Sequence, residues 1–291
     1  PAASKGGVFV DCTLGEGGHS WLMLNEFAGV KIIAFERDSE ILAVARERLS
    51  GFQDRIEFIN ANFDSIQSHL KNRSDAIRAF LYDFGVSSYH FDKSGRGFSF
   101  RDDEPLDMRL DANAKRSAHD IINGASEMEL TEIFSKYGQE RWAKRIARFV
   151  CRARREHPVE TSRELAELVL RAIPARYHVK NIHPATRVFQ ALRIAVNDEL
   201  SAITKSLPAA IGLLASGGRV CAVSFHSLED RLVKDAFRRA ARGCVCDEEH
   251  CRCNNQPRAM VITKKPVLPG AEEIAKNKRA RSARLRVAEK L

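Results

Sequence analysis

Short apolar runs rich in β-branched residues alternate with helical patterns through the first third of this 291-residue chain. The apolar runs predict buried strands at residues 7–12, 31–36, 56–59 and 76–84. Apolar residues at helical spacing predict helices between the early strands, at 19–27 and 39–49. Strands that alternate with helices need crossover connections, so the pattern predicts a parallel, doubly wound α/β sheet.

The strand pattern stops near residue 91 and returns only after residue 188. Helical spacing is strong between these points, at 139–155 and 162–173. Further elements are then expected, in order a helix, a strand, a helix and a last strand, at 188–214, 219–225, 227–241 and 259–263. We therefore expect a discontinuous sheet domain of residues 1–100 and 190–291, with an inserted helical domain of residues 101–189.

Charge is distributed unevenly along the chain, whose net charge is +9. Residues 1–110 carry 13 basic and 17 acidic side chains, residues 141–187 carry 12 and 4, and residues 258–291 carry 10 and 3. Basic segments of this kind predict a polyanionic partner, most simply a nucleic acid, although a solvated basic surface is the alternative. The residues expected to grip phosphates are Arg145, Arg148 and Arg152 in the insertion and Arg281, Arg284 and Arg286 in the tail.

Several classes of protein are disfavoured by what the sequence lacks. It has no apolar run near the roughly 18 residues of a membrane span, so no membrane association is expected. Seven cysteines, an odd number without a secretion signal, favour a reducing cytoplasmic location over a disulfide framework. The phosphate-binding pattern Gly-x-x-x-x-Gly-Lys-Ser/Thr and the nucleophile pattern Gly-x-Ser-x-Gly are both missing.

A glycine-rich turn, residues 11–19, joins the first strand to the first helix. Such a turn at the carboxyl end of a parallel strand is the usual crevice for a nucleotide-like ligand, although many are simply tight corners. Asp11 and Glu16 in or beside the turn would repel a pyrophosphate. They would favour a ligand with an amino group and a sulfonium, and S-adenosylmethionine has both.

Three further side chains are expected at the same edge of the sheet. Glu36 ends the second strand, where a carboxylate can accept both ribose hydroxyls. Asp83 ends the fourth strand and could face the ligand or the incoming substrate. Phe63 follows the third strand and could flank an adenine, while a core position is an equally good interpretation.

Seven blocks spread from residue 11 to residue 231, and an eighth in the tail, together resemble one known family, the bacterial ribosomal RNA small subunit methyltransferase H (MraW-like) family. The blocks are DCTLGEGGHS at 11–20, DFGVSS at 83–88, RGFSF at 96–100, PLDMR at 105–109, YGQER at 137–141, HPATRVFQA at 183–191, SFHSLEDR at 224–231 and ARSARLR at 280–286.

This resemblance implies a class I S-adenosylmethionine-dependent methyltransferase, a Rossmann-like sheet with an inserted helical domain. The family methylates the exocyclic N4 of a cytidine in the decoding region of small-subunit (16S) ribosomal RNA. The implied partner is therefore small-subunit ribosomal RNA or the small ribosomal subunit. The oligomeric state is left open, with a homodimer as one alternative.

Carried over by position, the family's cofactor contacts fall on seven residues, Gly17, Gly18, His19, Glu36, Phe63, Asp83 and His90. Two of them depart from the usual family pattern. Glu36 stands where Asp is more common, and both can accept ribose hydroxyls. His90 stands where Gln is common, which puts that contact in doubt.

The expected chemistry needs a hydrogen-bond acceptor for a weakly nucleophilic amine, held in line with the methyl group and the sulfur. Asp83 is the candidate acceptor, and Ser87 on the same loop could hold the edge of the base. His226 follows the strand at 219–225 and is a third catalytic candidate, with a helix cap as the alternative. Asn197 and Arg187 are weaker candidates.

Four cysteines form a compact cluster, Cys244-x-Cys246-x4-Cys251-x-Cys253. Four thiolates can close a tetrahedral zinc site, but one-residue gaps are tighter than the usual two to four. Methyl transfer needs no metal, so none is assigned to the catalytic site. The cluster is either a structural zinc site or a set of thiols in a loop.

Three rival functions share parts of this pattern. A nicotinamide oxidoreductase would have the fold, but the acidic glycine turn disfavours it. An RNA-binding scaffold would keep the fold without binding S-adenosylmethionine. A DNA amino-methyltransferase usually carries an Asn/Asp/Ser-Pro-Pro-aromatic motif, whereas this chain has Asp-Phe-Gly-Val at 83–86.

Overall fold

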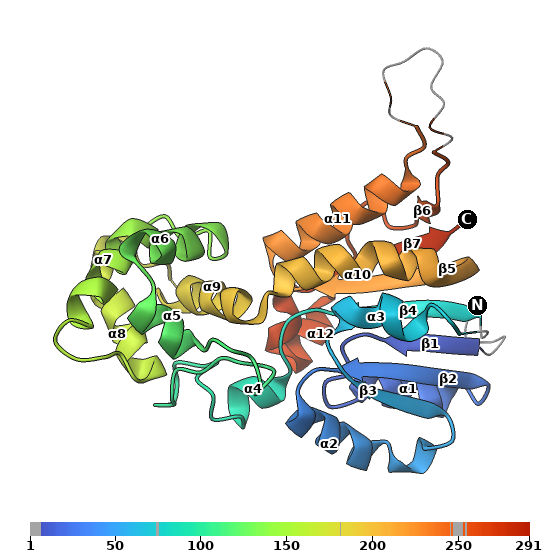
Figure 1. The fold of residues 1–291 in the computed structure, drawn as a ribbon, viewed down its shortest axis with the longest axis horizontal. Coiled ribbons are helices and arrows are strands. Elements are labelled where there is room, and N and C mark those ends of the chain that lie inside the picture. The colour runs from blue at the N-terminus through green and yellow to red at the C-terminus, as the bar shows by residue number, and fades with distance from the viewer. Residues whose placement is uncertain (1–6, 74–75, 181, 245, 247–252, 254) are drawn as a thin grey trace. The chain divides into compact units, whose positions relative to one another are not determined.

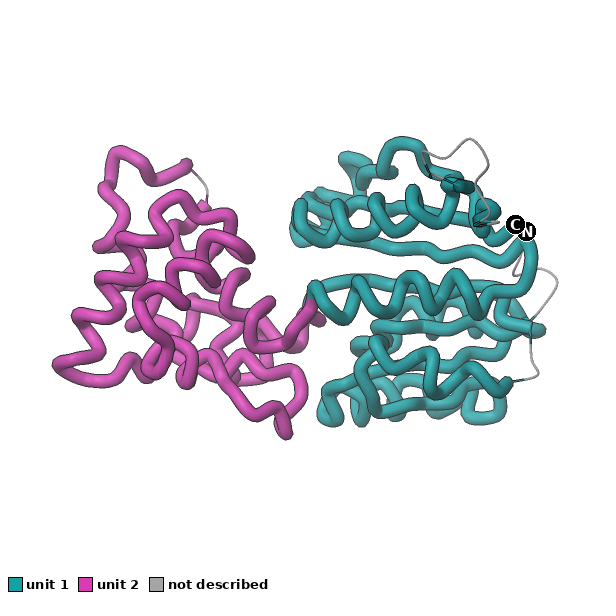
Figure 2. Tube along the Cα trace, turned by 45° about the horizontal axis from the view of Figure 1, so that its top comes forward, with its two compact units in different colours: residues 1–85, 200–291 teal, residues 86–199 magenta. Residues whose placement is uncertain are grey.

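The computed structural model describes residues 7–73, 76–180, 182–244, 246, 253 and 255–291 (Figure 1). The chain divides into two compact units, residues 1–85 with 200–291 (unit 1) and residues 86–199 (unit 2), coloured separately in Figure 2. Residues 86–100 and 190–199, which we expected in the sheet domain, cluster with unit 2. The functional boundaries of the two domains stay a prediction.

Unit 1 is built on a seven-stranded sheet with strand order β3-β2-β1-β4-β5-β7-β6. The strands are β1 (Gly7–Asp11), β2 (Val30–Glu36), β3 (Ile56–Asn60), β4 (Ile77–Asp83), β5 (Leu214–Ser224), β6 (Ala259–Val261) and β7 (Arg284–Lys290). The first five are parallel, and β7 runs antiparallel to both β5 and β6. The chain moves outward from β1 to β3 and then returns to β4 on the other side of β1. The carboxyl ends of β1 and β4 therefore form the switch point at which ligands bind in such sheets.

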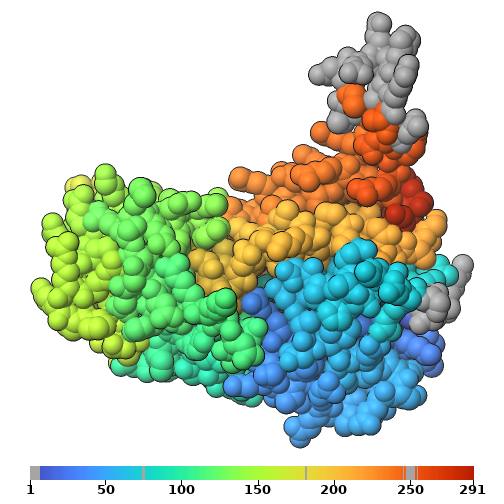
Figure 3. Space-filling model, in the orientation of Figure 1, coloured from blue at the N-terminus to red at the C-terminus, as the bar shows by residue number. Residues whose placement is uncertain are grey.

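Helices cover both faces of this sheet because residues of both faces are apolar. The helices of unit 1 are α1 (Gly18–Glu26), α2 (Ser39–Arg48), α3 (Ile66–Leu70), α10 (Glu199–Leu213), α11 (Ser227–Ala241) and α12 (Ala271–Lys276), with Glu199 itself assigned to unit 2. Along β2, Ile32 and Ala34 pack with α1 and α2, whereas Ile33 and Phe35 pack with α3, α10 and α11. In the space-filling view, α10 (gold) and the residues around α3 (cyan) lie over the face turned to the viewer (Figure 3). Period-2 alternation of the strands thus divides the core into two layers.

Unit 2 is helical around its own apolar core. Its helices are α4 (Ser88–Asp92), α5 (Ala118–Gly124), α6 (Glu127–Lys136), α7 (Ala143–Ala153), α8 (Ser162–Ala172) and α9 (Thr186–Asn197). The core is formed by side chains such as Phe134, Ile146, Val169 and Leu192. No named strand occurs among the described residues of this unit, as the sequence predicted.

Two sequence-based element predictions were wrong. The single helix expected at 188–214 is two helices, α9 and α10, because Asp198 between them adopts the left-handed conformation with φ 48°. Residues 259–263 were expected to hold the last strand, but β7 follows and lies between β5 and β6. Within the described part of the chain, no helix has both the length and the apolar character of a membrane span.

Candidate active site

The turn between β1 and α1 depends on glycine for its shape. Gly17 has φ 81°, and a Cβ placed on it would lie 2.8 Å from Leu49 Cδ1 on the neighbouring chain segment. Gly15 also has a positive φ, 53°. An L-residue is strained in this conformation, so glycines allow the chain to turn tightly into α1.

Asp11, at the carboxyl end of β1, holds this turn from within. It is 4% exposed and accepts hydrogen bonds from Ser20 Oγ at 2.7 Å and from the Thr13 backbone N–H at 3.2 Å. Burial raises the pKa of Asp11. Because it is buried and bonded to both the turn and α1, Asp11 supports the shape of the glycine-rich turn.

Glu36, at the carboxyl end of β2, reaches across to the turn. Its two carboxylate oxygens accept the backbone N–H groups of Gly15 and Asp38, each at 2.9 Å. Burial raises the pKa of Glu36 to about 7, although these hydrogen bonds oppose that rise. Each oxygen has a second lone pair, so the carboxylate can still accept hydroxyl donors such as those of a ribose.

Asp83, at the carboxyl end of β4, completes the acidic edge. Its backbone N–H donates to Thr13 Oγ1 at 2.7 Å, which ties β4 to the glycine turn. Its Oδ2 lies 3.3 Å from His19 Nε2 on α1. The hydrogen bond to Asp83 is the main cause that raises the pKa of His19. The structure thus brings Gly17, Gly18, His19, Glu36 and Asp83 to one edge of unit 1.

Phe63 lies in a short 3-10 turn after β3 and is half-buried. Its ring makes an edge contact with Tyr82 at 5.7 Å between centroids and a tilted contact with Phe84 at 5.9 Å. It packs against the core of unit 1 while keeping part of its surface exposed. Phe63 therefore has the core contacts of one interpretation, and its role beside an adenine stays a prediction.

His226 caps α11, which was the alternative interpretation. Its Nδ1 accepts the Glu229 backbone N–H at 3.4 Å, and Glu229 accepts the backbone N–H groups of Phe225 and His226 in return. This reciprocal capping box accounts for the position of the imidazole at the end of β5. A catalytic role for His226 stays a prediction.

Ser87 and His90 belong to unit 2, so the structure does not place them against the glycine turn. Ser87 caps the short helix α4 and accepts the Tyr89 backbone N–H at 3.2 Å. His90 is 4% exposed, with its ring 4.9 Å from that of Phe98. Their roles in catalysis and cofactor binding stay predictions.

The comparison with known proteins decides the family. A family model described as the MraW methylase family matches residues 2–291, nearly the whole chain. The chain belongs to this family. A relative from Geobacter sp. (strain M21) is 49% identical over 291 residues, which cover 99% of this chain and 93% of the relative. Another from Clostridioides difficile (strain 630) is 44% identical over 289 residues, which cover 98% and 93%.

Both relatives are named ribosomal RNA small subunit methyltransferase H. The family predicted from the sequence is therefore confirmed, and the chain is a methyltransferase rather than an oxidoreductase. The fold class is confirmed as well, since the sheet order and the antiparallel β7 are those of a class I methyltransferase.

Basic side chains follow one face of α7 in unit 2. Lys144, Arg145, Arg148 and Arg152 are exposed, while Ile146 and Val150 on the other face are buried. The guanidinium of Arg148 is 3.7 Å from the carboxylate of Glu127, which satisfies part of this charge. The predicted arginine face is therefore present and faces solvent.

Two aromatic rings lie beside this face, the exposed Tyr177 and the half-buried Trp142. Arg141 stacks over Tyr177 at 4.7 Å from the ring centroid and over Trp142 at 5.5 Å. The ring centroids of Trp142 and Tyr177 are 5.1 Å apart. Arg176 places a second guanidinium over the ring of Tyr177. Guanidinium and aromatic planes together are the usual platform for unpaired RNA bases.

One predicted phosphate contact in the tail is wrong. Arg286 is 7% exposed and donates to both carboxylate oxygens of Asp230 on α11, with Nε to Oδ1 at 2.6 Å. Arg284 also donates to Asp230, at 3.2 Å, but is itself exposed. Arg286 therefore joins β7 to α11, whereas Arg281 remains exposed at the surface.

Sequence reasoning also missed some supporting residues. Thr13 and Ser20 hold the glycine turn through their hydroxyls, and only their place in the turn could have indicated this. Asn197, a weak catalytic candidate, is 2% exposed and bonds the backbone of Met108 and Leu110. These bonds support the fold of unit 2, and a catalytic role for Asn197 stays a prediction.

Proposed function

We propose that this protein uses S-adenosylmethionine to methylate the exocyclic N4 of a specific cytidine in the decoding region of small-subunit ribosomal RNA. The observation that carries the proposal is the acidic edge of unit 1, where Glu36, Asp83 and a positive-φ glycine turn meet at the switch point of the sheet. The names of the family's relatives support the RNA substrate.

The residues at this edge fit S-adenosylmethionine better than a dinucleotide. Two carboxylates near the turn would repel a pyrophosphate, but they attract an ammonium group and a sulfonium. Gly17 and Gly18 let the ligand approach the backbone closely, and Glu36 accepts the ribose hydroxyls. Phe63 offers a partly exposed ring for the adenine. When bound, S-adenosylmethionine supplies a methyl group on a sulfonium, a good electrophile that needs no metal.

Asp83 is the residue best placed to assist the amine. The lone pair of cytosine N4 is delocalised into the ring, so an acceptor for one of its protons makes the nitrogen more nucleophilic. Asp83 Oδ2 is engaged by His19, and Oδ1 can accept from the amine. Positioning supplies the rest of the effect, because holding reactants in line can lower a barrier by up to roughly 7–11 kcal/mol.

The target base must be unstacked before it can reach Asp83. We assign the grip on the RNA backbone to the α7 arginines, and the stacking of unpaired bases to Trp142 and Tyr177. We further propose Ser87 as a holder of the base edge, His90 as a cofactor contact and His226 as a catalytic group. The partner is small-subunit RNA or the assembled subunit, in the cytoplasm, and a homodimer is one arrangement to test.

Methylation in vitro tests the proposal. Purified protein with S-adenosylmethionine is incubated with small-subunit RNA or assembled subunits, and the nucleosides are analysed by mass spectrometry for N4-methylcytidine. Asp83→Asn should lower the rate about 100-fold. Asp54→Asn, an exposed carboxylate in the same unit, is the control and should leave the rate unchanged. A different methylated nucleoside, or an Asp83→Asn rate equal to that of the control, would contradict the proposal.

A further inference from the structure

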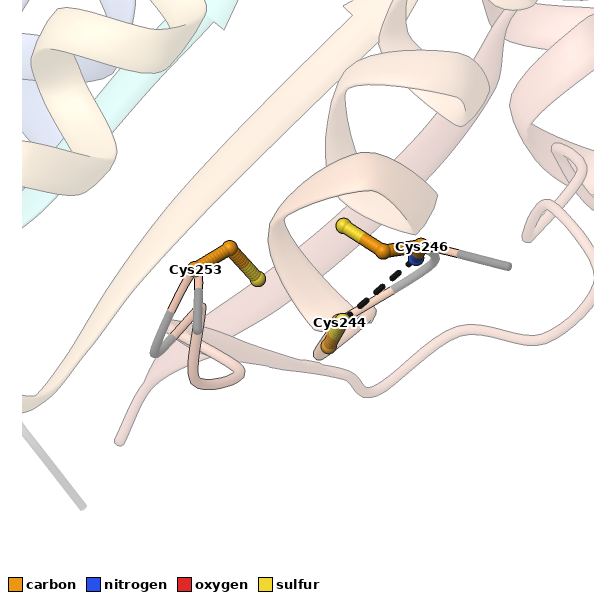
Figure 4. Close-up of side chains that lie close together, drawn as sticks. All are labelled: Cys244, Cys246 and Cys253. Atoms are coloured by element: carbon orange, nitrogen blue, oxygen red, sulfur yellow. Dashed lines mark hydrogen bonds between the residues drawn. The ribbon is translucent and has the colours of Figure 1, made fainter. Parts of the chain in front are cut away.

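Three cysteines lie together at the base of the connection between α11 and β6 (Figure 4). The Sγ atoms of Cys244, Cys246 and Cys253 all lie within 4.8 Å of one another, and all three residues are exposed. These cysteines are far along the chain from the residues of the acidic edge, and the proposed methyl transfer does not use them. We propose that these three thiolates bind a structural zinc ion.

The spacing of the sulfur atoms fits one ion. Zinc bonds thiolates at about 2.3 Å in tetrahedral geometry, which places its sulfur ligands about 3.8 Å apart. Sulfurs already within 4.8 Å reach that spacing through rotations of exposed side chains. An iron–sulfur cluster would hold its thiolates farther apart because several iron atoms lie between them. The distances therefore favour a single ion over a cluster, and zinc is the usual single ion at structural sites made of cysteines.

The backbone around the cysteines is already arranged for binding. The Arg258 N–H donates to Ala240 O at 2.8 Å, and the Asn255 side chain donates to Gly243 O at 3.2 Å. These bonds hold the end of α11 beside the start of β6, so Cys244 and Cys253 approach each other from opposite arms. A ligand set that the fold has already gathered loses little entropy when the metal binds.

One backbone donor already lies beside a sulfur atom of the cluster. The Cys246 backbone N–H lies 3.4 Å from Cys244 Sγ, where it donates to the sulfur. An N–H donor stabilises a thiolate, and the thiolate is the form that ligates metal. Three thiolates and Zn²⁺ carry a net charge of −1. Zinc binding then releases the protons of those thiols that were not ionised.

A tetrahedral ion has four ligands, and the three described cysteines would supply three of them. Cys251 lies outside the described residues. The proposal depends on the three cysteines that the structure brings together.

Metal content tests the proposal without reference to activity. Protein prepared under reducing conditions without chelator should contain about one zinc per chain by elemental mass spectrometry. The double variant Cys244→Ser/Cys246→Ser should contain less than about a tenth of this, since a hydroxyl is a poor zinc ligand. The matched control is Cys151→Ser/Cys221→Ser, which changes two cysteines elsewhere in the chain and should keep the wild-type content.

Cobalt substitution gives a second measurement. It uses the wild-type protein, so misfolding of a variant cannot affect the result. After chelation and addition of Co²⁺, the wild-type chain should show the near-ultraviolet sulfur-to-cobalt absorption of thiolate ligands, and Zn²⁺ should abolish it. Wild-type protein that takes up neither metal, or that contains iron instead, would overturn the proposal. An equal loss of metal in the control variant would also overturn the proposal. The same is true if the cluster cysteines form disulfides in protein prepared under reducing conditions.

Discussion

Glu36 combines a buried carboxylate with a ligand-binding position, so its protonation should control cofactor affinity. Burial raises its pKa to about 7, and hydroxyl donors stabilise the charged form. We therefore expect affinity for S-adenosylmethionine to increase as the pH rises toward 7 and then to level off. Glu36→Gln should lower the affinity for S-adenosylmethionine about tenfold, because the ribose hydroxyls lose hydrogen bonds to a charged acceptor. The variant should also lose the pH dependence of this affinity.

Calorimetric titration across this pH range measures both effects. Glu47→Gln, on the exposed face of α2, is the matched control and should behave as the wild type. If the affinity of Glu36→Gln for S-adenosylmethionine still depends on pH, another titrating group is responsible.

Two adjacent glycines allow a matched comparison of backbone strain. Gly17 has φ 81° and its Cβ would lie 2.8 Å from Leu49, whereas Gly18 is helical with no atom within 4 Å of a built Cβ. Gly17→Ala should lower the free energy of unfolding by about 1–2 kcal/mol. Gly18→Ala should raise it slightly or leave it unchanged, because alanine favours the helix. Urea unfolding of both variants compares them, and equal effects would refute the role assigned to the left-handed turn.

Individual site residues were predictable where the strand pattern was strong. Glu36 and Asp83 end apolar runs, and the carboxyl ends of parallel strands meet at one edge, so their approach to the glycine turn followed from the sequence. The contacts of Thr13 and Ser20 could not be predicted in this way. Short hydroxyl side chains have many local partners, and only the folded turn selects one of them.

Helices and strands also differ in how well the sequence predicts them. The helix α11 was predicted with its observed bounds because its capping residues and apolar spacing agree. The strand β7 was missed because its two buried positions are Arg286 and Ala288, which do not form an apolar stripe. A charged side chain faces inward there only because Asp230 on α11 lies opposite, a contact between residues 56 positions apart.

This buried ion pair should be important for the stability of the β7 edge. Burial alone would raise the pKa of Asp230, but its hydrogen bonds and charge interactions with Arg286 and Arg284 lower it below the ordinary 3.8. Asp230→Asn should therefore lower the free energy of unfolding by about 3 kcal/mol near neutral pH, since Arg286 is left buried without its partner charge. The stabilisation is present above the unfolded pKa and is lost as the pH falls through the lower folded value.

Chemical unfolding at several pH values measures this prediction. The difference between wild type and Asp230→Asn should shrink below about pH 4, where the wild-type carboxylate also becomes protonated. Asp235→Asn, an exposed residue on the same helix, should have no comparable effect. A difference that persists unchanged in acid would show that the charge of Asp230 is not its source.

At the scale of the molecule, the two units divide the proposed work. Unit 1 carries the acidic edge that suits a cationic methyl donor, and unit 2 carries the arginine face of α7. The segment charges of the sequence indicated only part of this division. The basic excess of residues 141–187 lies in unit 2, but the basic tail at 258–291 belongs to unit 1 together with most of the acidic segment 1–110. Where unit 2 begins could not be read in the same way, since the α/β pattern fades over several residues before the first helices of the insertion.

Charge reversal on α7 should therefore separate the two binding functions. Changing Arg145, Arg148 and Arg152 to Glu should weaken RNA binding strongly. It should also reduce the slope of log affinity against log salt by up to roughly 2–3, because each lost phosphate contact removes about 0.7–0.9 from that slope. Affinity for S-adenosylmethionine should stay unchanged because its proposed contacts are in unit 1.

The matched control reverses three exposed basic residues of unit 1, Lys31, Arg46 and Lys71. It changes the net charge by the same amount, so it separates a local contact from a general loss of attraction. Filter binding of RNA at several salt concentrations and calorimetry of the methyl donor supply the two measurements. If both triple variants lose the same RNA affinity, net charge rather than the α7 face governs binding. If only the α7 variant does, the RNA is held by unit 2.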